Sequence, residues 1–303
     1  MSIAVDRPLP DRPRRAPFQW SHVGVHGVLI LYTCIALAPV LLIISNSLKP
    51  ANAIFAHPFS VPWKGNFDFV GYKTVADIGH FEIYFKNSII VTVATVFLVM
   101  TLSAMAAYAL SEYRFMGNTL LAIFFAIGIM IPIRLGTVSI LRLTKDMGLL
   151  SGDRGIGWIF GPTYGPLAAL VFVYTAMGIP LGIFLMTQFM KQVPSDLKNA
   201  ARVDGAGEYR VFSLTLPLVR PGLAAVAVFT MLPVWNDLWF PLLLAPKEGS
   251  RTVTLGAQQF LGQYASDWNS ALAALTLAML PVMALYIVFS RQFLGGLTKG
   301  AID

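Results

Sequence analysis

Long apolar runs alternate with shorter polar segments along this chain. Each apolar run holds about 20 residues or more, which is enough for a helix to cross the hydrocarbon core of a bilayer. The runs show no period-two alternation, so they favour membrane helices over the strands of a barrel. We predict an all-α polytopic membrane protein with six transmembrane helices, at about 26–45, 88–110, 118–141, 166–189, 223–244 and 270–290.

The composition points the same way. Charged residues make up 12% of the chain, against about 25% in a typical soluble domain. The net charge of +7 does not indicate nucleic-acid binding, because the basic residues sort between the two sides of a membrane. Twelve of the 22 Lys and Arg residues lie in the tails and in the 111–117 and 190–222 loops, and nine lie in the other three loops. The positive-inside rule then predicts that both termini and the 190–222 loop are cytoplasmic.

Two other segments outside the spans have a distinct composition. Residues 1–25 form a basic, proline-rich tail, which we expect to lie in the cytoplasm and to touch anionic lipid headgroups. The 46–87 loop combines prolines with several aromatic residues, so we expect an ordered periplasmic segment near the membrane interface.

The 190–222 loop carries the most specific motif. It includes Val193-Pro-Ser-Asp-Leu-Lys-Asn-Ala-Ala-Arg-Val-Asp-Gly-Ala, in which Ser195 can cap a helix and Gly205 can stop it. This pattern predicts two short helices joined by a sharp glycine turn. The segment resembles the coupling loop of binding-protein-dependent ABC importer permeases, which docks into a groove on a separate ATPase subunit.

The resemblance extends over about residues 27–303. Its landmarks are Asn87-Ser-Ile-Ile, Ala106-Ala-Tyr-Ala-Leu, Ile131-Pro, Leu149-Leu, Trp235-Asn-Asp-Leu-Trp-Phe-Pro-Leu and Gly296-Leu-Thr-Lys-Gly-Ala. They are similar to the shorter, six-span subunit of maltose-type carbohydrate importers. The resemblance implies the ABC importer type I permease fold and an alternating-access mechanism. It also implies a second permease subunit, two ATPase subunits, a periplasmic solute-binding protein and a carbohydrate substrate.

Carried onto this sequence, the resemblance implies a set of ATPase-coupling residues. Asn199 stands where the family has a glutamate, so the docking geometry is implied and the polar contact at that position is not. The residues are Leu197, Asn199, Ala200, Ala201, Asp204, Gly205 and Ala206.

The sequence offers no chemistry of its own to drive transport. It lacks a G-x-x-x-x-G-K-[ST] loop, so we expect ATP and Mg²⁺ to be bound by partner ATPase subunits and this chain to hold no cofactor. No His, Cys and carboxylate cluster has metal-ligand spacing, and Cys34 is the single cysteine. We therefore expect a transport subunit rather than an intramembrane enzyme or receptor, which would need a catalytic group within the spans.

Two charged residues fall within the predicted spans. Arg134 and Asp237 should face protein or water, since a charge in hydrocarbon is costly. They either pair with each other or separately face a water-filled cavity. Near Asp237, aromatic and amide groups suit sugar recognition, although aromatic residues also form belts at membrane interfaces. The expected substrate-path residues are Arg134, Trp235, Asn236, Asp237 and Trp239.

The 245–269 loop matches in position the segment that reaches into the binding protein in maltose-type permeases. It either contacts the binding protein or merely covers the outer mouth of the bundle. Its candidate contact residues are Thr252, Thr254, Gln258, Gln259 and Gln263. The sequence names no particular sugar, and an amino acid or polyamine is the alternative solute.

Overall fold

The computed structural model describes residues 20–63, 65–77, 80–152, 154–262 and 267–299, and every regular element in those ranges is a helix. The all-α prediction is therefore confirmed for the described chain. The chain divides into two compact units, Met1–Ile43 and Ile44–Asp303. Residues 1–19 of the tail predicted at 1–25 lie outside the described residues, and its remaining residues belong to a helix that begins at Trp20.

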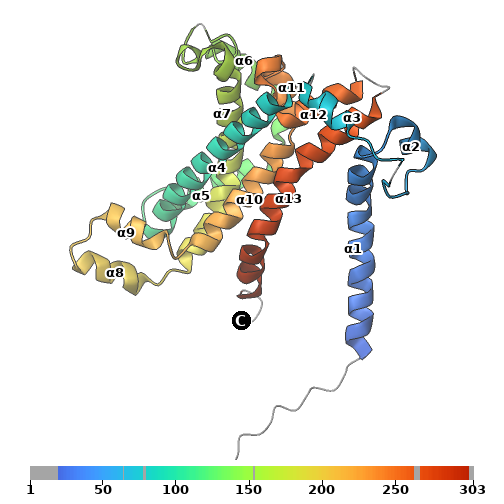
Figure 1. Ribbon diagram of the computed structural model, residues 1–303. Coiled ribbons are helices and arrows are strands. Elements are labelled where there is room, and N and C mark those ends of the chain that lie inside the picture. Colours follow the sequence, from blue (N-terminus) through green and yellow to red (C-terminus); the bar gives the residue numbers. More distant parts are fainter. Residues whose placement is uncertain (1–19, 64, 78–79, 153, 263–266, 300–303) are drawn as a thin grey trace, which may run out of the picture. The chain divides into compact units, whose positions relative to one another are not determined.

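The described part of the first unit belongs to α1 (Trp20–Ser47) (Figure 1). Its apolar stretch Gly24–Ser47 is long enough to span a membrane, and none of its most apolar window is buried within the chain. Apolar residues surround the whole helix, as expected where lipid or another protein covers it.

The second unit is a helical bundle with short helices at both ends (Figure 1). Its elements are α2 (Ala51–Ala56), α3 (Val70–Asp77), α4 (Phe81–Glu112), α5 (Asn118–Met130), η1 (Ile133–Gly136), α6 (Thr137–Asp146), α7 (Gly157–Lys191), α8 (Ser195–Val203), α9 (Glu208–Thr215), α10 (Arg220–Asn236), α11 (Trp239–Leu244), η2 (Glu248–Ser250), α12 (Val253–Gly262) and α13 (Trp268–Lys299).

Within the described residues, α1, α4 and α7 are each long and apolar enough to cross a membrane. Two bent pairs also qualify if each counts as one span: α5 with the η1–α6 segment, bent by 83°, and α9 with α10, bent by 76°. In α13, the apolar stretch Trp268–Ala284 is shorter. The count of six spans thus stays a prediction.

Two helices that we expected to be continuous are broken. The expected helix at 118–141 ends at Met130 because Ile131 precedes Pro132, and a residue before proline is disfavoured in the α region. The expected helix at 223–244 is interrupted at Asp237, whose backbone is extended at φ −71° and ψ 135°. Both breaks border the same cavity, as described below.

The core of the bundle is built on close packing between α4 and α7. Gly182 on α7 lies so near α4 that a Cβ atom there would stand 2.2 Å from the Ser103 hydroxyl oxygen. Ser103 and Ala107 on α4 have no exposed surface. Small residues thus allow the two backbones to approach closely. Dense packing then stabilises the contact, because the hydrophobic effect does not drive helices together in lipid.

Candidate coupling surface and translocation cavity

The α8–α9 segment forms the expected helix–turn–helix. Gly205 follows α8 with φ +82°, a conformation that favours glycine. The N–H of Gly205 donates to the Arg202 carbonyl at 3.0 Å, and the N–H of Ala206 donates to the Ala201 carbonyl at 2.9 Å. These two bonds make a Schellman turn, so the helix stop expected at Gly205 is confirmed. Ser195 is the first helical residue rather than the cap, a position that Pro194 takes.

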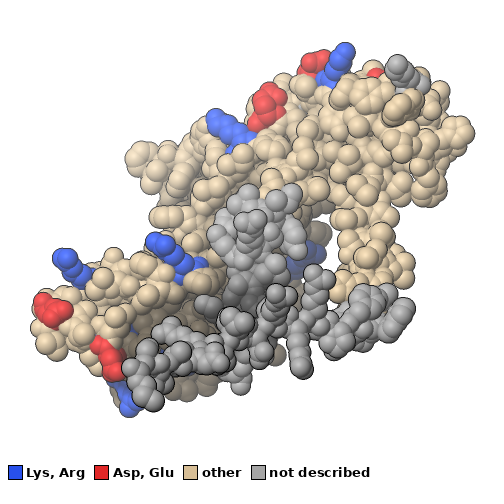
Figure 2. Space-filling model, turned by 60° about the horizontal axis from the view of Figure 1, so that its bottom comes forward, with Lys and Arg blue, Asp and Glu red and all other residues tan. Residues whose placement is uncertain are grey.

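Most of the predicted coupling residues lie on the surface of this turn. Leu197, Asn199, Ala200, Asp204 and Gly205 are exposed, whereas Ala201 and Ala206 are half-buried and pack against the core. Two apolar side chains that sequence reasoning missed, Val203 and Tyr209, are almost fully exposed beside them. The turn therefore offers a small and partly apolar surface. In the view of Figure 2, which brings the lower end of Figure 1 forward, charged side chains occupy only small areas of the visible surface.

A charge network ties α8 to the end of α4. Lys198 and Arg202, which lie one helical turn apart, both pair with Glu112, and the Arg202 Nη2 to Glu112 Oε1 distance is 2.8 Å. Lys198 is buried within this network. The four-residue spacing of the two basic residues places them on one face of α8, but it does not identify Glu112 as their partner.

Glu208, the first residue of α9, extends this network. It accepts hydrogen bonds from Arg202 Nε at 2.8 Å, from the Tyr113 hydroxyl at 2.7 Å and from the Tyr108 hydroxyl at 3.1 Å. The bond from Arg202, followed by that from Tyr113, lowers the pKa of Glu208 to about 2. The same pairing with Glu208, and then with Glu112, raises the pKa of Arg202 above its ordinary value. The four charges hold both short helices on α4.

A cavity of about 370 Å³ lies where the broken helices meet α7. Its lining includes Arg134, Tyr174, Phe229, Asn236 and Asp237. It combines aromatic faces with hydroxyl, amide and charged groups. Such a mixture can bind a polar solute that has apolar faces.

Asp237 is held by one neighbour on α7 and one on α11, the helix that follows the break. The Tyr174 hydroxyl donates to Asp237 Oδ2 at 2.8 Å, and the Phe240 N–H donates to the same oxygen at 3.0 Å. Among the described side chains, no ion pair joins Arg134 to Asp237. Of the two arrangements that the sequence left open, the structure has both residues lining one cavity without pairing.

The two tryptophans beside Asp237 point elsewhere. Trp235 is buried, and its indole N–H donates to the Ala278 carbonyl of α13 at 3.0 Å. The indole N–H of Trp239, which is half-exposed, donates to Thr137 Oγ1 at 3.0 Å. Neither is part of the cavity lining, so they do not lie with Asn236 and Asp237 as expected.

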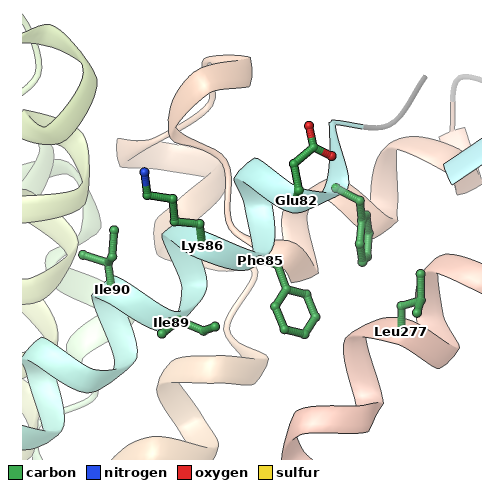
Figure 3. A pocket seen from close by; sticks show the side chains of 7 residues that line it. Glu82, Phe85, Lys86, Ile89, Ile90 and Leu277 are labelled. Carbon is green, nitrogen blue, oxygen red and sulfur yellow. The ribbon is translucent and has the colours of Figure 1, made fainter. Parts of the chain in front are cut away.

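A second cavity, of about 520 Å³, lies between α4 and α13 (Figure 3). Phe85, Ile89 and Leu277 give it an apolar wall. The Glu82 and Lys86 side chains project from the other side of α4 in Figure 3. This cavity therefore lacks the polar groups that a carbohydrate would need.

The beginning of the 245–269 loop is bound to α4. The Asn87 side-chain amide donates to the Gly249 carbonyl at 3.1 Å and to the Arg251 carbonyl at 3.0 Å. Within the loop, Thr252 is buried and the Thr254 hydroxyl donates to the Trp235 carbonyl at 2.8 Å.

The loop's glutamines differ in exposure. The Gln259 side-chain oxygen accepts a hydrogen bond from the Arg251 guanidinium, whereas Gln258 is exposed. Gln263 lies outside the described residues. Among the described candidates, Gln258 alone is exposed. In the described chain, no three His, Cys, Asp or Glu residues gather as metal ligands would.

Comparison with known proteins gives consistent matches. Residues 100–295 match the family described as binding-protein-dependent transport system inner membrane component. The diacetylchitobiose uptake system permease protein of Streptomyces coelicolor is 33% identical over 279 residues, covering 91% of this chain and 87% of that protein. The trehalose/maltose transport system permease protein of Thermococcus litoralis is 31% identical over 225 residues, covering 74% of this chain and 76% of that protein.

A solved structure matches at the level of the fold. It is the crystal structure of a bacterial ABC transporter involved in the import of the acidic polysaccharide alginate. The TM-score is 0.74 at 21% identity, and the match covers 91% of this chain and 99% of that chain. The arrangement of helices described above is therefore that of an ABC importer permease.

Proposed function

This chain belongs to the binding-protein-dependent transport system inner membrane components, and from that membership we propose that it is the permease subunit of an ATP-driven carbohydrate importer. The observation that carries the proposal is the α8–α9 turn, a compact exposed helix pair fixed to a membrane-length helix. An ATPase that docks on this turn can move α4 directly.

The sugar substrate is favoured over an amino acid or polyamine. Relatives that cover most of this chain are named for diacetylchitobiose and for trehalose and maltose. The cavity beside Tyr174 and Asp237 supports the same choice, because aromatic faces suit sugar C–H groups and carboxylate or amide groups suit hydroxyls. This chain would form one half of the translocation path, and a second permease subunit would form the other half.

The remaining partners follow from the same family membership. Two ATPase subunits would bind ATP and Mg²⁺, and a periplasmic solute-binding protein would deliver the sugar. In this assignment both termini and the α8–α9 turn are cytoplasmic. ATP-driven closure of the ATPases then moves the turn and alternates access to the cavity.

The η2–α12 segment is proposed to meet the binding protein, with Gln258 as its outward-facing polar group. Thr252 and Thr254 would instead support this segment from within, since one is buried and the other bonds to the backbone of Trp235. Shortening the loop between Lys247 and Gln263 should spare basal ATP hydrolysis and abolish its stimulation by the loaded binding protein. Unchanged stimulation would leave the loop as a cover over the bundle.

The function is tested by purification and reconstitution. An affinity-tagged chain should copurify with an ATPase subunit, and Gly205→Val should uncouple ATP hydrolysis from transport. Gly207→Ala serves as the matched control, because a Cβ atom there meets nothing within 4 Å and its φ is −68°. Failure to recover any ATPase with the intact chain would refute the assignment.

The solute is tested separately. Thermal shifts of the cognate binding protein against a panel of oligosaccharides, amino acids and polyamines should select an oligosaccharide. Stabilisation by an amino acid or polyamine alone would keep the permease assignment and refute the carbohydrate.

A further inference from the structure

Residues 55–69, here called the aromatic segment, present an unusual row of exposed apolar side chains. Phe59 is 81% exposed and Trp63 is 75% exposed. Between Pro50 and Phe67 the sequence contains one charged residue, Lys64. The exposed large side chains are Phe55, Phe59, Val61, Trp63, Phe67 and Phe69.

A buried lysine fixes this segment to the end of α1. Lys49 has no exposed surface, and its ammonium group donates to Asn46 Oδ1 at 2.9 Å, to the His57 carbonyl at 3.0 Å and to the Pro58 carbonyl at 3.1 Å. All three ammonium donors are thereby used, as burial of a charged group requires. Phe59, the next residue, cannot move far from the last turn of α1.

Further bonds return the rest of the segment to the same place. The Asp68 N–H donates to the Leu48 carbonyl at 2.9 Å, and the Ser47 and Tyr72 hydroxyls share a hydrogen bond of 2.7 Å. The segment is therefore anchored at both its beginning and its end. Its aromatic side chains remain exposed although its backbone is tied down.

The length of α1 sets the depth of this anchor. The apolar stretch Gly24–Ser47 has 24 residues, and at about 1.5 Å per residue it is about 36 Å long. The hydrocarbon core of a bilayer is about 30 Å thick, or about 40–45 Å with its headgroup layers. A helix of this length ends within a headgroup layer, so the aromatic segment is held at that level.

We propose that the aromatic segment inserts into the lipid headgroup layer and anchors α1 at the membrane surface. Trp and other aromatic side chains favour this layer, where a ring can lie among apolar groups while polar atoms stay wet.

The test measures the depth of spin labels on the full-length chain, purified with its copurifying subunits and reconstituted in vesicles of phosphatidylethanolamine and phosphatidylglycerol. Cys34 is the single cysteine, so Cys34→Ser gives a clean background. Nitroxide labels are placed at Phe59→Cys and at Trp63→Cys. The control label is Asp77→Cys, an exposed position at the end of α3 in the same loop.

Labels at positions 59 and 63 should collide often with oxygen and several-fold less often with a water-soluble nickel chelate than the control label does. The cognate binding protein should not change these values. Equal access of the nickel chelate at all three positions would overturn the proposal. Loss of oxygen access only when the binding protein is added would also overturn it, and would assign the surface to that protein. Neither outcome depends on which solute is transported.

Discussion

Replacing Glu112 by glutamine should weaken the attachment of the α8–α9 turn to α4. Glu112 and Lys198 have side chains only 11% and 10% exposed, so their pairing is largely shielded from water. Glutamine keeps the size and one acceptor of the side chain but removes its charge. Lys198 then remains buried beside a neutral group, and Arg202 keeps its bonds to Glu208 and to Asn199 Oδ1.

The expected magnitude follows from these contacts. A hydrogen bond to a charged group contributes about 1.5–3 kcal/mol, and removing one partner of a buried pair costs more than removing an exposed one. Because Arg202 is 29% exposed, its share is partly screened, and we expect a total of about 2–3 kcal/mol. That energy lowers the protection of α8 against local opening roughly 30- to 150-fold.

Hydrogen exchange of the reconstituted complex, read by mass spectrometry over residues 195–215, measures this change. Lys198→Met should cost much less on the Glu112→Gln background than on the native one, since the pair is already broken. Asp196→Asn is the matched control, because it removes an exposed acidic charge from the same helix. Unchanged exchange after Glu112→Gln, or an equal effect of the control, would refute the reasoning.

Four further outcomes are expected. Gly205→Val should uncouple ATP hydrolysis from transport at a cost of about 1–3 kcal/mol in the turn, whereas Gly205→Asn should be tolerated because asparagine adopts positive φ more readily. Gly182→Ala should destabilise the α4–α7 contact by about 1–3 kcal/mol in a detergent unfolding assay, while Gly207→Ala should leave the midpoint unchanged. Tyr174→Phe should reduce transport while leaving ATPase copurification intact, because the hydroxyl that orients the cavity carboxylate is lost. Because its pKa is lowered, the pairing of Glu208 stabilises the turn fully above pH about 4.3, the ordinary pKa of glutamate, and this stabilisation is lost as the pH falls toward 2. The protection of α9 against hydrogen exchange should follow that course. A loss of protection between pH 7 and 5 would contradict the prediction.

The sequence predicted elements well where the local signal was strong. The turn at Gly205 was predictable because a glycine between two short helical segments is typical of a helix end with positive φ, which the structure shows. Hydropathy located the C-terminal ends of α4 and α7 within a few residues.

The rest depended on tertiary contacts. Nothing in the local sequence tells whether Trp235 faces the cavity or α13, because its position depends on which helix packs beside α10. The pairing of Lys198 with Glu112 joins residues 86 positions apart, so no local pattern could reveal it. The hydropathy pattern also does not indicate the helix breaks at Ile131 and Asp237, because a break changes the apolar character of the run very little.

The Schellman turn has an evolutionary consequence. Its shape depends on Gly205 and on two main-chain hydrogen bonds, neither of which involves a neighbouring side chain. Mutation of outward-facing residues of α8 such as Leu197 and Ala200 can therefore change chemical complementarity while leaving the geometry of the turn intact. Under the proposed function, such substitutions would change which ATPase surface this turn fits while the turn itself keeps its shape.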